Sequence, residues 1–213
     1  MTQTVSERAR RGRPRSFEDE DVLRLTTHLL IEEGLTAVTL PRIAKDLGVS
    51  PQAIAQRFES KAGLIASYRL WFNRIVAEDI ATIVREAASP LAALCELLVM
   101  PMNARMSASH WDDPNIGWIL LNVELRRAPQ VPPESGEDPQ HFMDIVIDLI
   151  RRAQAEGTMR AGDPVATAEL LIAVVAGGAL QWTLQPEGDM RSRLIRYRDV
   201  VLAPYLIPDD ASA

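Results

Sequence analysis

Apolar residues recur every three or four positions along most of this chain, which is the spacing of one face of an α-helix. In the first such segment Val22, Leu25, Leu29 and Leu30 share a face, and Gly34 ends the segment. We find no run of alternating apolar and polar residues long enough to predict a strand. The pattern therefore predicts an all-α protein.

Residues that suit helix ends mark several helices close together in the first third of the chain. A glycine, Gly48, suits the end of the second helix, and Pro51 suits the first position of the third. The fourth helix is longer and runs towards Arg85. Side chains that can cap a helix N-terminus are expected at Ser16 (in a capping box with Asp19), Thr39, Ser50 and Ser60.

The second and third helices have the spacing of a helix-turn-helix. Counting Leu40 as the first position, Ala44 is fifth, Gly48 is ninth and Ile54 is fifteenth. A small residue lets the helices approach, a glycine supplies a left-handed turn, and an apolar residue holds the second helix down. We expect the remaining apolar contacts from Ile43, Leu47 and Val49.

Downstream, prolines separate longer helical segments, which we expect at 91–106, 114–127, 139–156, 164–185 and 190–206. The domain organisation that follows is a flexible basic arm at 1–15, a helix-turn-helix domain at 16–62, a larger helical domain at 63–207, and a tail at 208–213.

Composition and charge narrow the class of protein. The 213 residues are 47% apolar and carry a net charge of −6, yet residues 1–15 hold five arginines against Glu7 alone. A basic arm on an acidic body suggests a local contact with a polyanion, and Gly12 and Pro14 keep such an arm extended enough for a minor groove. One cysteine, no apolar run of about 18 residues and no secretory signal indicate a soluble cytoplasmic protein without a membrane segment.

Residues 21–68, DVLRLTTHLLIEEGLTAVTLPRIAKDLGVSPQAIAQRFESKAGLIASY, resemble the DNA-binding domain of the TetR family of bacterial regulators. The pattern G-V-S-x-x-x-I-x-x-x-F-x-S-K-x-x-L, from Gly48 to Leu64, carries most of the likeness. The stretch at 151–188 resembles, more loosely, the dimer helices of that family. The resemblance implies that residues 16–62 form a DNA-binding domain and that residues 63–207 form an effector-binding and dimerisation domain. It implies a homodimer on a palindromic operator, most often a repressor released by a small effector.

The expected DNA contacts follow from the recognition helix and from the helix caps. Glutamine can bind adenine and arginine can bind guanine, while caps and first turns suit phosphate. The family's usual tyrosine is replaced by Ala55 and its frequent histidine by Arg57, so operator preference cannot be transferred from relatives. The predicted contacts are Arg13, Arg15, Thr39, Arg42, Ser50, Gln52, Ala53, Gln56, Arg57 and Lys61.

A mostly apolar effector is expected near Pro101, which should kink or break a helix. Methionines and tryptophans gather there, and such side chains suit ligands of varied shape. The effector would displace the far part of the fourth helix and so change the spacing of the recognition helices. The candidate contacts are Trp71, Ile75, Met102, Asn103, Met106, Trp118 and Asn122.

Two segments are expected to form the dimer. One has an apolar helical face, and the other has a patch of small residues that includes two consecutive glycines, as a closely approaching helix would require. The predicted interface is Phe142, Ile145, Val146, Leu149, Ala173, Gly177 and Leu180.

Two other functions remain open. One is an architectural DNA-binding protein that needs no effector. The other is a helical enzyme, for which the sequence offers no nucleophile motif, phosphate loop or dinucleotide fingerprint. His28, His110 and His141 do not have the spacing of metal ligands, so no cofactor or metal is expected.

Overall fold

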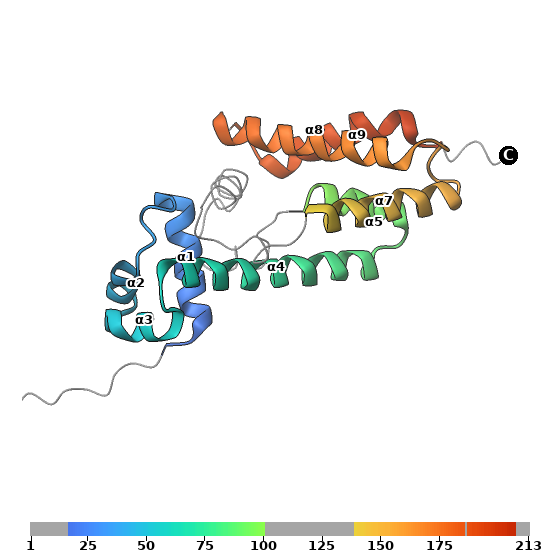
Figure 1. Ribbon diagram of the computed structural model, residues 1–213. Coiled ribbons are helices and arrows are strands. Elements are labelled where there is room, and N and C mark those ends of the chain that lie inside the picture. The colour runs from blue at the N-terminus through green and yellow to red at the C-terminus, as the bar shows by residue number, and fades with distance from the viewer. Residues whose placement is uncertain (1–16, 101–138, 186, 208–213) are drawn as a thin grey trace, which may run out of the picture.

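The computed structural model describes residues 17–100, 139–185 and 187–207, and in these ranges the chain is helical (Figure 1). An isolated antiparallel bridge between Met159 and Leu206 is the one β-type pairing recorded there. The all-α prediction is confirmed. The helices are α1 (Asp19–Glu33), α2 (Leu40–Leu47), α3 (Pro51–Phe58), α4 (Lys61–Glu86), α5 (Pro90–Leu98), α7 (Pro139–Ala155), α8 (Pro164–Leu184), α9 (Met190–Leu202) and the short 3-10 helix η2 (Ala203–Tyr205).

The helices form a small group at one end of the molecule and a layered body at the other (Figure 1). Helices α1, α2 and α3 make the small group, and α4 runs from this group along the body. Helices α5 and α7 lie on the far half of α4, and α8 and α9 form the outer layer. Because α4 contacts α1 and α3 as well as α5, it joins the two parts.

The helix caps of the small group follow the predicted chemistry with one exception. The hydroxyls of Thr39, Ser50 and Ser60 each accept a hydrogen bond from the backbone N–H three residues on, as N-cap side chains do. The prediction for Ser16 is wrong. Helix α1 begins two residues later than that cap requires, and its capping box is formed by Glu18 and Asp21.

The turn between α2 and α3 is built as predicted. Gly48 has left-handed backbone angles, φ 69° and ψ 31°, which a residue without a Cβ adopts at no steric cost. Its N–H and that of Val49 donate to carbonyls in the last turn of α2, at 3.2 and 2.9 Å. Ala44 and Ile54 are fully buried, so the helices meet where the spacing required.

The corner between α3 and α4 is tighter than the sequence suggested. Glu59 has φ 63° and ψ −53°, and the Ser60 N–H donates to the Phe58 carbonyl at 2.6 Å, which makes a strained γ-turn. In the first turn of α4, a Cβ at Gly63 would collide with that same carbonyl. Only glycine therefore fits at position 63 without moving the end of α3.

Prolines shorten two of the predicted body helices. Helix α5 ends at Leu98, three residues before Pro101, because a residue preceding proline disfavours helical angles. The break expected near Pro101 is thus confirmed, although residues 101–138 lie outside the described ranges. Helix α9 ends at Leu202 rather than at 206, and Pro204 lies in the short 3-10 helix that follows.

The apolar face of α7 belongs to the interior of the chain, which corrects part of the predicted dimer interface. Val146 is 0% exposed and Leu149 is 1% exposed, because α7 packs between α5 and α8. Neither side chain is available to a second chain. Periodicity revealed that this face is buried but not which helices bury it.

One flank of α8 is apolar and uncovered. Leu170 and Leu184 are 44% and 68% exposed, as is 74% of Val200 on α9. The stretch Pro164–Trp182 is long and apolar enough to cross a membrane by length and composition, and 28% of it is buried. It is not an unbroken apolar run, because Thr167, Glu169 and Gln181 lie within it.

Candidate nucleic-acid interface

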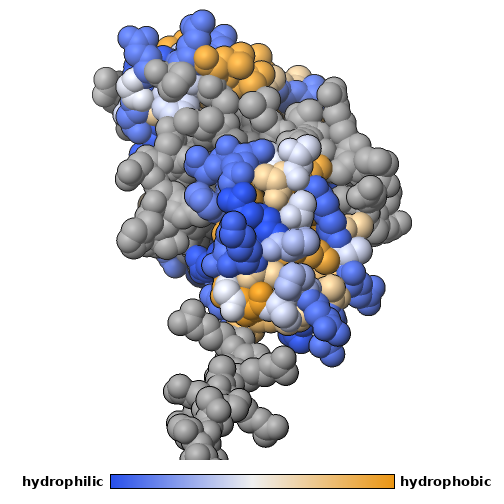
Figure 2. Space-filling model, turned by 90° about the vertical axis from the view of Figure 1, so that its left-hand side faces the viewer, coloured by the Kyte–Doolittle hydropathy of each residue, from blue (hydrophilic) through white to orange (hydrophobic). Residues whose placement is uncertain are grey.

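Helix α3 presents a polar side to solvent at the end of the molecule (Figure 2). Gln52, Gln56 and Arg57 are exposed, while Ala53 is half-buried beside them. Ile54 and Phe58 lie on the opposite side, in the core. This end of the molecule is mainly hydrophilic with scattered apolar residues (Figure 2). The helix is therefore anchored by one face and free to present amide and guanidinium groups with the other.

The two predicted cap contacts keep a donor available. The Thr39 hydroxyl accepts from the Arg42 N–H at 3.3 Å, and the Ser50 hydroxyl accepts from the Ala53 N–H at 3.1 Å. In both cases the hydroxyl acts as acceptor, and a hydroxyl also carries one hydrogen to donate. Phosphate contacts from these two residues thus remain predictions that the cap geometry permits.

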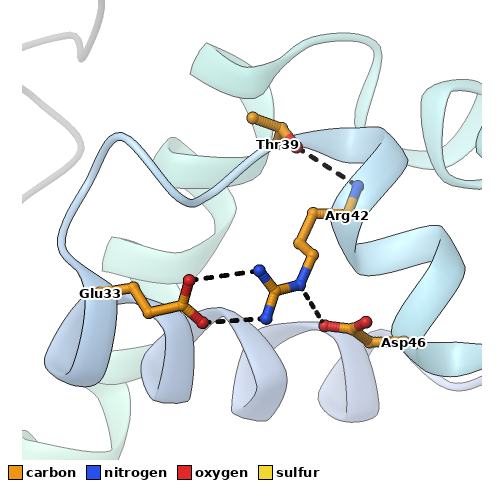
Figure 3. Close-up of polar contacts among 4 residues, drawn as sticks. All are labelled: Glu33, Thr39, Arg42 and Asp46. Atoms are coloured by element: carbon orange, nitrogen blue, oxygen red, sulfur yellow. Dashed lines mark hydrogen bonds and ion pairs between the residues drawn. The ribbon is translucent and has the colours of Figure 1, made fainter.

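Arg42 is held by two carboxylates (Figure 3). Its Nη1 and Nη2 donate to the two oxygens of Glu33 at 3.2 and 2.9 Å, and its Nε donates to Asp46 at 2.7 Å. The hydrogen bond and charge of Asp46, followed by those of Glu33, raise the pKa of Arg42. All three nitrogens are engaged, so a phosphate would have to displace a carboxylate. The arrangement fits a brace between α1 and α2.

Arg57 is paired with Asp19, which lies 38 positions earlier at the start of α1. Its Nε donates to Oδ1 at 2.7 Å and its Nη2 donates to Oδ2 at 2.8 Å. The pair is solvent-facing, with 62% of the arginine side chain and 43% of the aspartate side chain exposed. The hydrogen bond and charge of Asp19 raise the pKa of Arg57. The first helix and the recognition helix are thereby linked.

The remaining predicted cation, Lys61, donates from Nζ to the Leu35 carbonyl, in the loop after α1. This uses one of the three donors of an ammonium group. Residues 17–62 hold eight acidic and five basic side chains, a net charge of −3. The folded helix-turn-helix is therefore acidic, and much of its positive charge is neutralised within the chain.

Sequence reasoning missed the carboxylates at this site. Asp19, Glu33 and Asp46 orient the arginines. Asp19 and Glu33 lie on a different helix from their partners, and Asp46 lies one turn after Arg42 on the same helix. The i,i+4 spacing of Arg42 and Asp46 was the one local signal. The two other pairs, 9 and 38 positions apart, depend on the tertiary fold.

Several predicted residues lie outside the described ranges. These are Arg13 and Arg15 of the arm, and Met102, Asn103, Met106, Trp118 and Asn122 of the expected effector site. Of the two effector residues on α4, Trp71 is buried in the core at 7% exposure and Ile75 is half-buried against it.

A groove of about 410 Å³ lies between α4 and α7. Its floor is apolar and includes Ile80, Val84 and Ile145, and Asp144, Asp148 and His141 also line it. Ile145, expected at the dimer interface, therefore faces α4, and Phe142 is half-buried against the core.

The small residues of α8 lie in two different environments. A Cβ at Gly178 would lie 2.5 Å from the ring of Tyr197, so this glycine lets α9 approach. A Cβ at Gly177 would meet no atom within 4 Å, and Ala173 is exposed beside it. Leu180 is half-buried on the same helix. The α8 part of the predicted interface is thus open to a partner.

The fold and this site define a helix-turn-helix protein with a separate helical body. The family model of the bacterial regulatory proteins of the tetR family matches residues 22–68. The HTH-type transcriptional repressor BdcR of Escherichia coli strain K12 is 28% identical over 125 residues, which is 59% of this chain and 50% of BdcR. The chain thus spans about half the length of the curated relative it matches.

Solved structures share the whole fold. A TetR transcription regulator from Haloarcula marismortui superposes with a TM-score of 0.73 at 16% identity, covering 89% of this chain and 98% of that one. A protein from Saccharomonospora viridis in complex with choline gives 0.72 at 18% identity with the same coverage. Residues 22–68 thus match the tetR family model, and the chain shares the fold of these solved structures.

Proposed function

We propose that this protein is a DNA-binding transcriptional regulator of the repressor type, which binds a palindromic operator as a homodimer. The observation that carries the proposal is the α2–α3 unit, with its glycine turn, two capped helices and exposed polar face of α3. A recognition helix of this kind reads base edges in the major groove. A two-fold dimer would then bind two half-sites about one helical turn apart.

The dimer is supported by the uncovered flank of α8 and α9. Leu170, Leu184 and Val200 are exposed apolar side chains on these two helices, and pairing with a second copy would cover them. The same contact accounts for the apolar length of α8 without a membrane. A cytoplasmic dimer is therefore the form we propose.

The effector part of the proposal rests on the route through α4. One end of α4 contacts the helix-turn-helix and the other end contacts α5, so a ligand in the body could change the relative position of the recognition helices. A ligand shifts such an equilibrium only by its difference in affinity for the two states. The choline complex of the Saccharomonospora protein supports the idea that this fold accepts small molecules. We propose a small, mostly apolar effector that lowers DNA affinity.

DNA selection from a random duplex library tests the first part. The purified chain should enrich a palindrome, and Arg57→Ala should relax base preference at one position in each half-site. Arg85→Ala is the matched control, because this arginine is 65% exposed at the far end of α4. Enrichment of a single asymmetric half-site, or equal effects of both substitutions, would contradict the proposal.

Sedimentation tests the dimer. Leu184→Glu and Val200→Glu should produce monomers, whereas Leu70→Glu should not, although Leu70 is an equally large apolar residue that is 59% exposed on α4. Partition of the wild-type chain into detergent or vesicles would indicate instead that α8 inserts into a membrane.

A fluorescence screen tests the effector. Operator DNA should weaken the binding of an effector. The factor should equal the factor by which that effector weakens DNA binding. If ligands bind equally well with and without operator, the result would favour the alternative of an architectural DNA-binding protein that needs no effector.

A further inference from the structure

The ion pair between Asp19 and Arg57 engages one particular edge of the guanidinium. A guanidinium is a planar fork with five N–H donors. Asp19 occupies the side edge, formed by Nε and Nη2, with both carboxylate oxygens. Among the contacts recorded for the described residues, Nη1 makes none. The end edge, formed by Nη1 and the second hydrogen of Nη2, is therefore left for another acceptor.

Arg42 provides an internal comparison. Glu33 takes its end edge and Asp46 takes its Nε, so no edge of Arg42 is left to a ligand. Arg24 is held by Glu20 through Nε and Nη2 in a similar way, but it lies on α1. Arg57 is held in place and is able to donate two parallel hydrogen bonds. It also lies on α3, next to the exposed Gln56.

The charge of Asp19 selects the kind of acceptor. A carboxylate within 2.8 Å cancels the positive charge of Arg57 and repels a phosphate that approaches the same group. A guanine base carries no net charge, and its O6 and N7 accept from the two N–H groups of an arginine end edge. A neutralised guanidinium with fixed orientation therefore suits guanine better than phosphate.

We propose that Asp19 is a positioning residue that presents the end edge of Arg57 to a guanine in each half-site. The inference rests on the proposed function, since it requires α3 to enter the major groove. Arg57 makes the base contact, and Asp19 acts through Arg57. The selectivity of the protein for guanine over the other bases at that position then depends on a residue of the first helix.

The test uses the full chain and its selected operator duplex. In the wild type, replacing one guanine per half-site by 7-deazaguanine, which lacks the N7 acceptor, should weaken binding about tenfold. Asp19→Asn should weaken operator binding about 5- to 20-fold and remove most of the 7-deazaguanine effect. Asp19→Glu should restore part of both. In an Arg57→Ala background, Asp19→Asn should have no further effect on the operator.

Glu20→Gln is the matched control. It removes one negative charge from the same turn of α1, where Glu20 pairs with Arg24 and not with α3. It should leave the guanine preference unchanged. Thermal unfolding of each variant checks that the fold is retained, which is expected because the Asp19–Arg57 pair is largely exposed.

One outcome for Asp19→Asn would overturn the proposal. If Asp19→Asn tightens binding to operator and random duplexes alike and steepens the salt dependence, Arg57 contacts phosphate and Asp19 merely repels it, and the proposal is overturned. If a palindrome is selected but no guanine depends on Asp19, this inference fails while the proposed function stands. If the wild-type chain selects no sequence, both fail.

Discussion

Replacing Tyr68 by phenylalanine should stabilise the protein. Tyr68 lies on α4 in the core beside Trp71 and Phe72, with ring centroids 6.2 and 6.0 Å away, and it is 1% exposed. Its hydroxyl has no hydrogen-bond partner among the residues that the structure describes. Burial raises the pKa of Tyr68 and Thr27 opposes this shift, but the Thr27 hydroxyl donates to the Leu23 carbonyl at 3.0 Å rather than to the tyrosine. A hydrogen bond requires alignment as well as proximity.

The expected gain follows from the cost of the buried hydroxyl. A buried polar group without a partner costs about 1–3 kcal/mol. The void left by the missing oxygen destabilises the variant by a few tenths of a kcal/mol, at about 24 cal/mol per Å³. Tyr68→Phe should therefore raise the free energy of unfolding by about 1–2 kcal/mol. For a chain of this size that corresponds to a rise of roughly 2–8 °C in Tm.

Chemical and thermal unfolding at one fixed protein concentration measure this change, since the proposed dimerisation would make Tm depend on concentration. Tyr205→Phe is the matched control, because Tyr205 is only half-buried, and its effect should stay within about 0.5 kcal/mol. A loss of stability on Tyr68→Phe would refute the reasoning and would mean that Thr27 and Tyr68 share a hydrogen bond worth more than the burial cost.

An alkaline titration is a second test of the burial of the Tyr68 hydroxyl. Burial raises the pKa of Tyr68 above its ordinary value, because the charged tyrosinate is disfavoured in the core. The folded chain keeps a proton that the unfolded chain releases above pH of about 10, so the contribution is complete below that pH and is lost as the pH rises further. The advantage of Tyr68→Phe over the wild type should grow above pH of about 10. An advantage that stays constant would contradict the assignment.

Further predictions concern three glycines. Gly63→Ala should destabilise the protein by about 1–3 kcal/mol, because a Cβ meets the Phe58 carbonyl, and unchanged thermal unfolding would contradict the tight corner. Gly178→Ala should lower Tm by displacing Tyr197 of α9, although alanine favours the helix by about 1 kcal/mol. Gly177→Ala has open space within the chain, so it should keep the fold and weaken self-association in sedimentation. An unchanged dimer would mean that no partner helix approaches that position.

The elements that the sequence predicted best are those decided by neighbouring residues. A cap hydroxyl at Thr39 or Ser50 bonds to an N–H three residues on, and the Gly48 turn closes within six residues. The failure at Ser16 is of the same local kind. Two overlapping capping boxes were available, Ser16 with Asp19 and Glu18 with Asp21, and the structure uses the second.

Contacts between distant segments could not be predicted in this way. The periodicity of α7 shows that Val146 is buried, but a partner chain and the same chain's α5 and α8 would produce the same pattern. The pairing of Asp19 with Arg57 likewise requires the start of α1 to lie beside the end of α3. A sequence pattern fixes which side of a helix is used, and the tertiary fold fixes what covers it.

The charges of the helix-turn-helix assign different tasks to different parts of the chain in the proposed function. Residues 17–62 carry −3 and residues 1–15 carry +4, so a general attraction to phosphate has to come mainly from the arm. The arginines of the folded part are braced by carboxylates, which weakens their pull on any polyanion and retains their directional hydrogen bonds. Affinity that depends on salt and selectivity that depends on base edges would then reside in separate segments. A change in the arm should alter the salt dependence without altering the preferred sequence, and a change at Asp19 should do the reverse.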